Sequence, residues 1–180
     1  MGSGNAAPHP PPWPYDGRVK WIALGVAGLS LVGSGLVAAA APASPGDGRV
    51  VVQKGIAGLR LGMTRTQVRA RVGRPRKVER GTNEIGRYVT LRYRTYSVTF
   101  FGGPHVTQMD TRAPNERTAG GIGVGSTRAE VAATVPRVKC LTEFGYNHCY
   151  VGIWKPGKAV TDFAIKNGRV TRVSIGYVID

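Results

Sequence analysis

A short motif occurs twice in this chain. Residues 61–68 (LGMTRTQV) return 63 positions later as residues 124–131 (VGSTRAEV), with Gly, Thr, Arg and Val at matching places. An internal repeat indicates a small structural unit present in two copies, and one such unit alone is too short to bury much apolar surface. The sequence therefore predicts two similar units packed together, at 44–111 and 121–180, joined by a polar linker at 112–120.

Each copy of the motif carries the start signal of a helix. Thr64 and Gln67 in the first copy, and Thr127 and Glu130 in the second, have the three-residue spacing of a capping box. In a capping box the threonine oxygen accepts a backbone N–H at the third helical position, and the side chain of that residue accepts the threonine N–H. The apolar residues just before each cap fit either a further turn of helix or an extended lead-in.

Strands are predicted after each helix. Apolar and polar residues alternate at 89–93 and at 96–100, on either side of a turn at Arg94 and Thr95. In the second copy, Asn167-Gly168 is a strong signal for a type I′ hairpin, and another alternating segment ends the chain. Each copy should thus be a short helical part followed by three or four antiparallel strands, which places the fold in the α+β class, with two sheets that lie side by side or face one another.

The N-terminal part of the chain has the pattern of an export signal. Residues 1–20 are rich in proline and glycine, end in a basic segment, and are predicted to be disordered. Residues 21–43 are uncharged and end in alanines, which is typical of a secretory signal peptide cleaved after Ala41 or Ala43. The 20 residues 22–41 are also long enough for a membrane anchor. Both interpretations place the repeats outside the cytoplasm.

The two cysteines, Cys140 and Cys149, both belong to the second copy. Disulfides persist in exported proteins, so these thiols are expected to form a bridge that closes a short loop. A metal site needs more ligands than His148 beside them can supply, since no third or fourth Cys or His lies near in sequence. We therefore expect no metal and no cofactor.

The charge of the chain is strongly positive. The formal net charge is +15, and it is +14 for residues 44–180, which exclude Arg18, Lys20 and Asp16. Most of this charge lies in the first copy and favours anionic partners or surfaces. A coding bias toward arginine, alanine and glycine would give the same composition without a selected partner. Nucleic acid is not expected as a ligand in vivo, because the repeats are predicted to be exported.

At the motif GMTRTQV (62–68), followed by Gly73 and echoed at Gly125, the chain resembles the tandem repeats of β-lactamase-inhibitory-protein-like (BLIP-like) proteins and the related small lipoproteins of the SmpA/OmlA type. The resemblance implies a helix–loop–helix packed on a four-stranded antiparallel sheet in each copy. It also implies a short-range disulfide where Cys140 and Cys149 lie. It indicates the fold better than the activity.

No residue set typical of an enzyme is found. Outside the N-terminal segment the only histidines are His105 and His148, in different copies, without an accompanying nucleophile motif or carboxylate pair. Catalysis by a side-chain nucleophile needs a base and a group that orients it. The chain is therefore predicted not to be an enzyme.

The predicted function is an exported, non-catalytic binding module that acts through an unidentified protein partner at the cell envelope. One alternative is a structural envelope protein held by charge on an anionic polymer or lipid surface, and a second is an inhibitor of a secreted hydrolase. Arginine and tyrosine are common among the residues that contribute most of the binding energy at interfaces. The simpler interpretation is that the basic residues form a solvated charged face and that the tyrosines support the sheet. The expected contact residues are Arg69, Arg71, Arg74, Arg76, Lys77, Arg80, Tyr88, Arg92, Tyr93 and Arg94.

Overall fold

The computed structural model describes residues 49–83, 85–143 and 145–179. These residues belong to one compact unit, Ser44–Asp180. The predicted segments 1–20 and 21–43 lie outside the described residues. In the part of the chain that is described, no helix is both long and apolar enough to cross a membrane.

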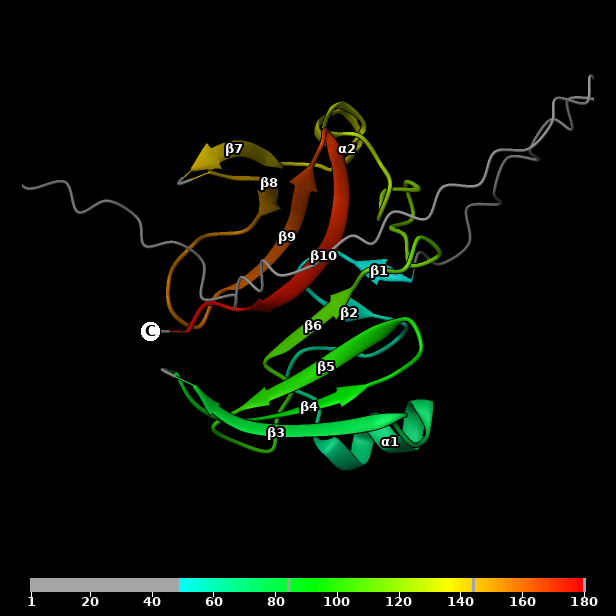
Figure 1. The fold of residues 1–180 in the computed structure, drawn as a ribbon, viewed down its shortest axis with the longest axis vertical. Helices are drawn as coiled ribbons and strands as arrows, with labels where there is room; N and C mark the ends of the chain where they lie inside the picture. The colour runs from blue at the N-terminus through cyan, green and yellow to red at the C-terminus, as the bar shows by residue number, and fades with distance from the viewer. Residues whose placement is uncertain (1–48, 84, 144, 180) are drawn as a thin grey trace, which may run out of the picture. The chain divides into compact units, whose positions relative to one another are not determined.

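Each copy contributes one helix and four strands, in the same order along the chain (Figure 1). The first copy contains α1 (Arg65–Val72), β3 (Lys77–Asn83), β4 (Gly86–Arg92), β5 (Tyr96–Phe101) and β6 (Gln108–Thr111). The second contains α2 (Arg128–Thr134), β7 (Lys139–Glu143), β8 (Tyr146–Val151), β9 (Ala159–Lys166) and β10 (Arg169–Tyr177). A short hairpin of β1 (Val50–Val51) and β2 (Gly55–Ile56) precedes the first copy.

Strands β3 to β10 form one antiparallel sheet with the order β3-β4-β5-β6-β10-β9-β8-β7. The two copies meet at their last strands, where Asp110 of β6 faces Ser174 of β10, 64 positions later, and Met109 faces Ile175. The halves are therefore related by an approximate twofold axis at the Asp110–Ser174 pair. The two four-stranded sheets lie side by side and merge, with β3 and β7 at the edges.

The prediction of an α+β fold is wrong, because the described residues are mainly β and contain two helices, one in each copy. The helix–loop–helix implied by the resemblance is not formed within residues 49–83, 85–143 and 145–179. In the first copy, Ala57 and Gly58 before the cap have φ angles of 54° and 77°. These left-handed conformations end any helical path, so the lead-in is a series of turns. The basic segment after α1, for which no strand was predicted, forms the edge strand β3.

Two local predictions are confirmed. Both capping boxes are complete: Thr64 and Thr127 accept from the backbone at Gln67 and Glu130, whose side chains accept in return. The β9–β10 hairpin turns at Asn167, with φ angles of 53° there and 72° at the next residue, as a type I′ turn requires.

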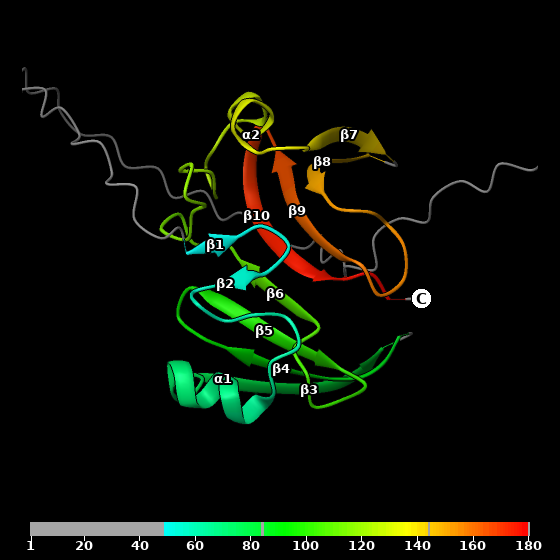
Figure 2. The same cartoon turned by 180° about the vertical axis from the view of Figure 1, so that it is seen from behind.

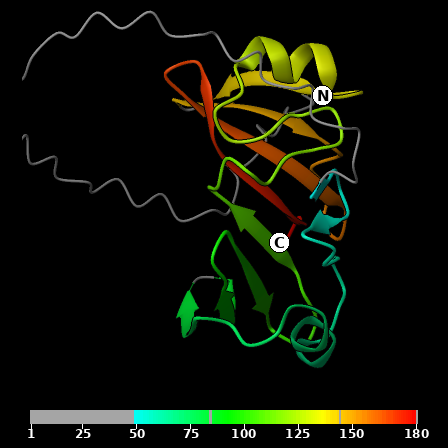
Figure 3. The ribbon, with the colours of Figure 1, turned by 90° about the vertical axis from the view of Figure 1, so that its right-hand side faces the viewer.

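The apolar core lies on one face of the sheet. Val98, Met109 and Ile175, which pair across neighbouring strands, are fully buried there, as are Val68 of α1 and Val131 of α2. Figure 2 shows α1 and the β1–β2 hairpin in front of this face, and Figure 3 shows α1 and α2 at opposite ends of the sheet. We call this the helix face and the opposite side, seen in Figure 1, the open face.

The segment between the copies is more than a polar linker. Its carboxylate Glu116 is 0% exposed. Thr95 donates its hydroxyl to Glu116 Oε1 at 2.6 Å, and Arg49 Nε lies 2.9 Å from Oε2. A buried carboxylate is tolerated only when it is paired in this way, so Glu116 ties the linker to the β4–β5 turn and to the start of β1.

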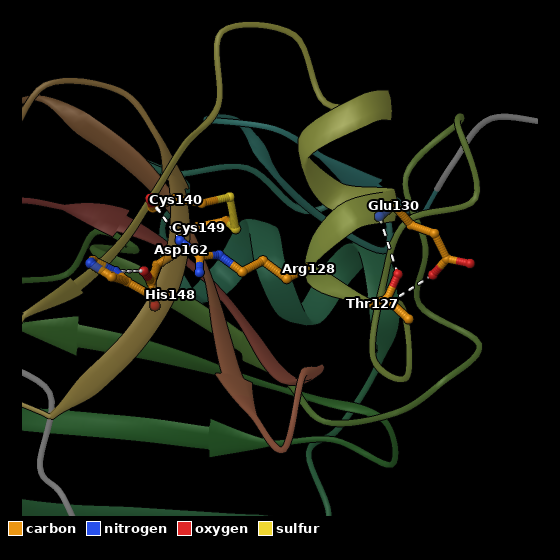
Figure 4. Close-up of a disulfide and its surroundings, with 7 residues drawn as sticks. All are labelled: Thr127, Arg128, Glu130, Cys140, His148, Cys149 and Asp162. Atoms are coloured by element: carbon orange, nitrogen blue, oxygen red, sulfur yellow. Dashed lines mark hydrogen bonds and ion pairs between the residues drawn. A yellow bond between two sulfur atoms is a disulfide. The ribbon is translucent and has the colours of Figure 1, made fainter.

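The predicted disulfide is confirmed. Cys140 and Cys149 are bonded and face one another in the neighbouring strands β7 and β8 (Figure 4). The bridge therefore joins the edge strand β7 to the sheet directly. Among the described residues no cysteine is free.

Loss of this bridge should cost stability. Replacing both Cys140 and Cys149 by alanine is expected to lower the free energy of unfolding by about 2–3 kcal/mol, because a short cross-link restricts the unfolded chain only modestly. Urea denaturation of the variant and of wild type with and without reductant measures this. Reduced wild type should match the variant within error, and a stability unchanged by both treatments would contradict the prediction.

Candidate binding surface

A row of side chains crosses the open face, one from each strand of the sheet. Its members pair in register from edge to edge, in the order Lys77, Arg92, Ser97, Asp110, Ser174, Asp162, Tyr150 and Lys139. The row is basic at both ends and carries two aspartates near its centre. Neighbouring strands place paired side chains about 5 Å apart, so these residues form one row over both copies, in which Asp162 and Ser174 are buried.

A buried hydrogen-bonded cluster lies on the open face of the second copy. Asp162 is 1% exposed and His148 is 2% exposed. His148 Nδ1 lies 2.5 Å from Asp162 Oδ1, and the Tyr146 hydroxyl donates to Asp162 Oδ2 at 2.6 Å. Since a carboxylate oxygen can only accept, Nδ1 carries the proton. Asp162 therefore holds both neighbouring rings in fixed positions (Figure 4 shows the Asp162–His148 contact).

Aromatic rings surround the imidazole of His148. The ring centres of Tyr146 and Tyr150 lie 4.7 Å and 5.5 Å from it, and that of Trp154, in the β8–β9 loop, lies 6.5 Å away. Trp154 also meets Tyr150 edge-on at 5.6 Å. Tyr146, Tyr150 and Trp154 are all partly exposed. This arrangement presents rigid aromatic edges to solvent over a buried polar support.

Burial, and then the charge of Asp162, strongly raise the pKa of the Tyr146 hydroxyl. Tyr146 therefore stays protonated and continues to donate to Asp162 over the physiological range. The two groups support one another, because the donor satisfies a buried carboxylate oxygen that water cannot reach.

A second polar cluster marks the junction of the copies. Ser174 Oγ donates to Asp110 Oδ1 at 2.7 Å, and Gln108 Nε2 donates to both carboxylate oxygens at 3.0 and 2.9 Å. Burial raises the pKa of Asp110 above its ordinary value of 3.8, although these hydrogen bonds and the nearby Arg172 act in the opposite direction. Ionised Asp110 is therefore less favourable in the folded chain than in the unfolded one.

The pH dependence of stability should report this. A carboxyl group whose pKa is raised on folding contributes stability below its unfolded pKa and loses it as pH rises through the folded pKa. The difference in unfolding free energy between Asp110→Asn and wild type should therefore shift in favour of the variant as pH rises from about 3 to about 7. Urea denaturation across this range tests it, and a difference that is constant or shifts toward wild type would contradict it.

In the first copy the open face carries an ion-pair cluster and an aromatic pair. Glu79 lies 3.0 Å from Lys77 Nζ and 2.7 Å from Arg92 Nε, and these two contacts lower the pKa of its carboxyl group. Tyr88 packs against Phe101 with ring centres 5.8 Å apart. One of the acids in the basic first copy is thus already neutralised by two of its cations.

The ten sequence-predicted contact residues lie on several surfaces. Lys77, Tyr88 and Arg92 are on the open face, and all eight basic members are exposed. The Tyr93 ring stacks on Tyr96 at 5.1 Å, on the side of the core. The other members lie on α1 (Arg69, Arg71), in the segment before β3 (Arg74, Arg76), on β3 (Arg80) and in the β4–β5 turn (Arg94).

The cluster of Tyr146, His148, Tyr150 and Asp162 was not predicted from the sequence. A signal for part of it exists, because residues 146, 148 and 150 alternate and so point to the same side of a strand. The aspartate could not be found this way, since its position depends on the register of β9 against β8 across a long loop.

His148 Nε2 is buried and has no hydrogen-bond partner among the described residues.

Within residues 49–83, 85–143 and 145–179, no group of three or more His, Cys, Asp or Glu side chains is arranged to hold a metal ion. Both cysteine sulfurs are in the disulfide. The chemistry that the open face offers is hydrogen bonding, aromatic contact and charge.

No protein-family model matches the chain, and no curated protein matches it. Two solved structures are similar in part. An extracellular protein containing a SCP domain from Bacillus anthracis is 8% identical with a TM-score of 0.46, over 65% of this chain and 44% of that one. A DUF4309 family protein (YjgB) from Bacillus subtilis is 15% identical with a TM-score of 0.42, over 72% of this chain and 88% of that one. The chain thus spans less than half the length of the first.

Proposed function

We propose that this chain is an exported, non-catalytic module that binds a protein partner at the cell envelope through its open face. The observation that carries the proposal is the set of partly exposed rings of Tyr146, Tyr150 and Trp154, held by the buried pair Asp162 and His148. Aromatic anchors that are already fixed lose little conformational entropy on binding, and such residues dominate interface energetics.

The same geometry argues against catalysis at this cluster. His148 is enclosed by rings and its Nδ1 is committed to Asp162, so a substrate has little access to the imidazole. A general base must lie within hydrogen-bond reach of the proton that it removes. Both cysteines are bridged, and Ser174 Oγ donates to Asp110, on a different strand pair.

The exposed arginines favour a second candidate, a structural protein held on an anionic envelope polymer or lipid surface. Arg69, Arg71, Arg74 and Arg94 are exposed outside the open face. Attachment by charge alone weakens as salt screens it, with the Debye length falling from about 8 Å at 0.15 M to about 3 Å at 1 M.

The relation to BLIP-like repeats also stays a proposal. It is supported by the repeated Gly-x-Thr-Arg motif, by one helix and four strands in each copy, and by the short-range disulfide of the second copy. It carries no activity here, since the described residues of each copy do not contain the second helix that the resemblance implied.

Affinity capture with the full chain, tagged at the C-terminus, tests the proposed function. Envelope and secreted fractions of the source cells would be applied at about 0.15 M and about 1 M salt, which changes screening strongly. We expect one protein retained at both salts by wild type, at least tenfold less by Tyr150→Ala, and unchanged amounts by Thr134→Ala on α2. Bulk anionic material released at high salt would support the second candidate and contradict the first.

A further inference from the structure

The helices α1 and α2 interact differently with the two edges of the sheet. At the β7 edge, Arg128 of α2 donates from Nη2 to the backbone oxygen of Cys140 at 2.9 Å (Figure 4). A side chain that takes up an edge carbonyl blocks the pairing of a further strand there. Strand β7 is also short, with five residues. The β7 edge is therefore partly capped.

The equivalent arginine of the first copy contacts an aromatic ring instead. Arg65 precedes Arg128 by 63 positions, and its guanidinium lies 5.2 Å from the centre of the Phe100 ring. Among the described residues no strand pairs with the outer side of β3, which has seven residues. Figures 1 and 2 show α1 beside the beginning of β3 only. Among the described residues, the β3 edge thus lacks the arginine contact that caps the β7 edge.

The hydrogen-bonding pattern of the sheet shows which backbone groups of β3 point away from β4. Tyr93 N–H donates to the oxygen of Tyr96, so odd-numbered residues of β4 bond toward β5. The side on which a residue forms its backbone hydrogen bonds alternates along an antiparallel strand. Arg92 and the other even-numbered residues of β4 therefore bond toward β3. In agreement with this, the carbonyl of Arg92 accepts from Arg76 N–H. By the register of β3 and β4, the groups that face outward are those of Val78, Arg80 and Thr82.

The charge along the β3 edge is positive and favours an acidic partner. Arg74, Arg76 and Arg80 are exposed, and Lys77, also exposed, shares the single acid of β3, Glu79, with Arg92. Antiparallel pairing of two β3 strands centred on Arg80 would place like charges opposite one another, which destabilises a sheet. A second copy of the chain is therefore disfavoured at this edge, whereas an acidic strand complements it.

An aromatic ring also reaches toward the edge. A Cβ placed on Gly81 would lie only 2.6 Å from Tyr88 Oη, so the Tyr88 ring lies across β3 where that strand has no side chain. Phe101 supports the ring from the inner side. A segment added outside β3 would meet this ring on the open face, next to the charged residues.

We propose that the outer edge of β3 docks an extended, acidic segment of a protein partner, which adds to the sheet as a ninth strand. Backbone hydrogen bonds to Val78, Arg80 and Thr82 supply affinity, as in other cases of strand addition. Carboxylates opposite Arg76 and Arg80, and an apolar residue against Tyr88, supply selectivity. The inference rests on the proposed function, because it describes one segment of the partner.

Three synthetic peptides test the docking, with the full chain as receptor. The first alternates Thr and Glu around one Phe, the second has Lys in place of Glu, and the third is the acidic peptide N-methylated at every second residue. We expect the first to bind and to protect the amides of Val78, Arg80 and Thr82 from hydrogen exchange. The other two should bind at least tenfold more weakly. Equal binding of the N-methylated peptide, or protection elsewhere, would overturn the proposal.

Two variants of Arg80 test the backbone and the charge. Arg80→Pro removes an outward N–H together with the positive charge and should abolish binding. Arg80→Glu keeps the N–H but reverses the charge and should weaken binding at least tenfold. Lys158→Glu, in the β8–β9 loop, makes the same charge reversal away from β3 and should leave binding unchanged. If a captured partner is retained equally by both Arg80 variants, the docking site is refuted while the proposed binding function stands.

Discussion

Replacing Asp162 by alanine should lower the free energy of unfolding by about 3–5 kcal/mol, the cost of removing one member of a buried pair. Asp162 accepts from Tyr146 and from His148, and its carboxylate is almost fully buried. Without it, two polar groups lose their partners inside the protein, where water cannot replace them. Urea denaturation followed by circular dichroism measures the change.

Asp162→Asn is the matched variant. An amide oxygen can still accept one of the two hydrogen bonds, so this variant should lose clearly less stability than Asp162→Ala. Equal losses in the two variants would mean that packing, and not the hydrogen bonds, sets the role of this residue. A loss below about 1 kcal/mol for Asp162→Ala, typical of a surface site, would contradict the assigned burial.

The second large effect is expected in the core at Phe163. This ring is 0% exposed and pairs with Val173 and Cys149 on the helix face of the sheet. Phe163→Ala should cost about 3–5 kcal/mol, because it removes buried apolar surface and leaves a cavity that close packing cannot fill. Thermal and urea unfolding would give the value.

Phe101→Ala provides the comparison on the other side of the sheet. Phe101 is partly exposed and contacts Tyr88 on the open face. Its loss should cost clearly less than that of Phe163, since much of its surface already meets water. If the two substitutions cost the same, the assignment of a buried helix face and an open face would be wrong.

Local features of this fold could be predicted wherever a few neighbouring residues decide the structure. The capping boxes at Thr64 and Thr127 need only a side chain three positions away. The turn at Asn167 needs only two residues that accept a positive φ. The disulfide followed from the presence of two cysteines in a chain predicted to be exported, and the structure adds that they face one another across two strands.

Strand β3 could not be predicted in this way. Its sequence, KVERGTN, has one apolar residue, Val78, and a glycine at 81, so it lacks the alternation of a half-buried strand. It pairs because β4 offers a free ladder beside it and because Tyr88 covers the glycine. Edge strands commonly carry charged side chains, and their sequences then resemble loops.

The fold class and the open-face cluster depended on distant contacts. The lead-in to α1 contains Ala57 in a left-handed conformation, which alanine adopts only at a cost of about 1–2 kcal/mol when the surrounding structure requires it. The pairing of Asp110 with Ser174 joins residues 64 positions apart. No local pattern indicates that the two sheets merge into one, or that Asp162 would meet His148.

The central claim is that the partner contacts the open face, and site-specific photo-crosslinking tests it most directly. A benzophenone amino acid would replace Tyr150 on the open face or, as a control, the exposed Ala133 on α2, in the full chain expressed in its own cells. After irradiation, we predict a covalent adduct with one protein from position 150 and none from position 133. An adduct from position 133 alone would contradict the account and place the contact surface on the helices.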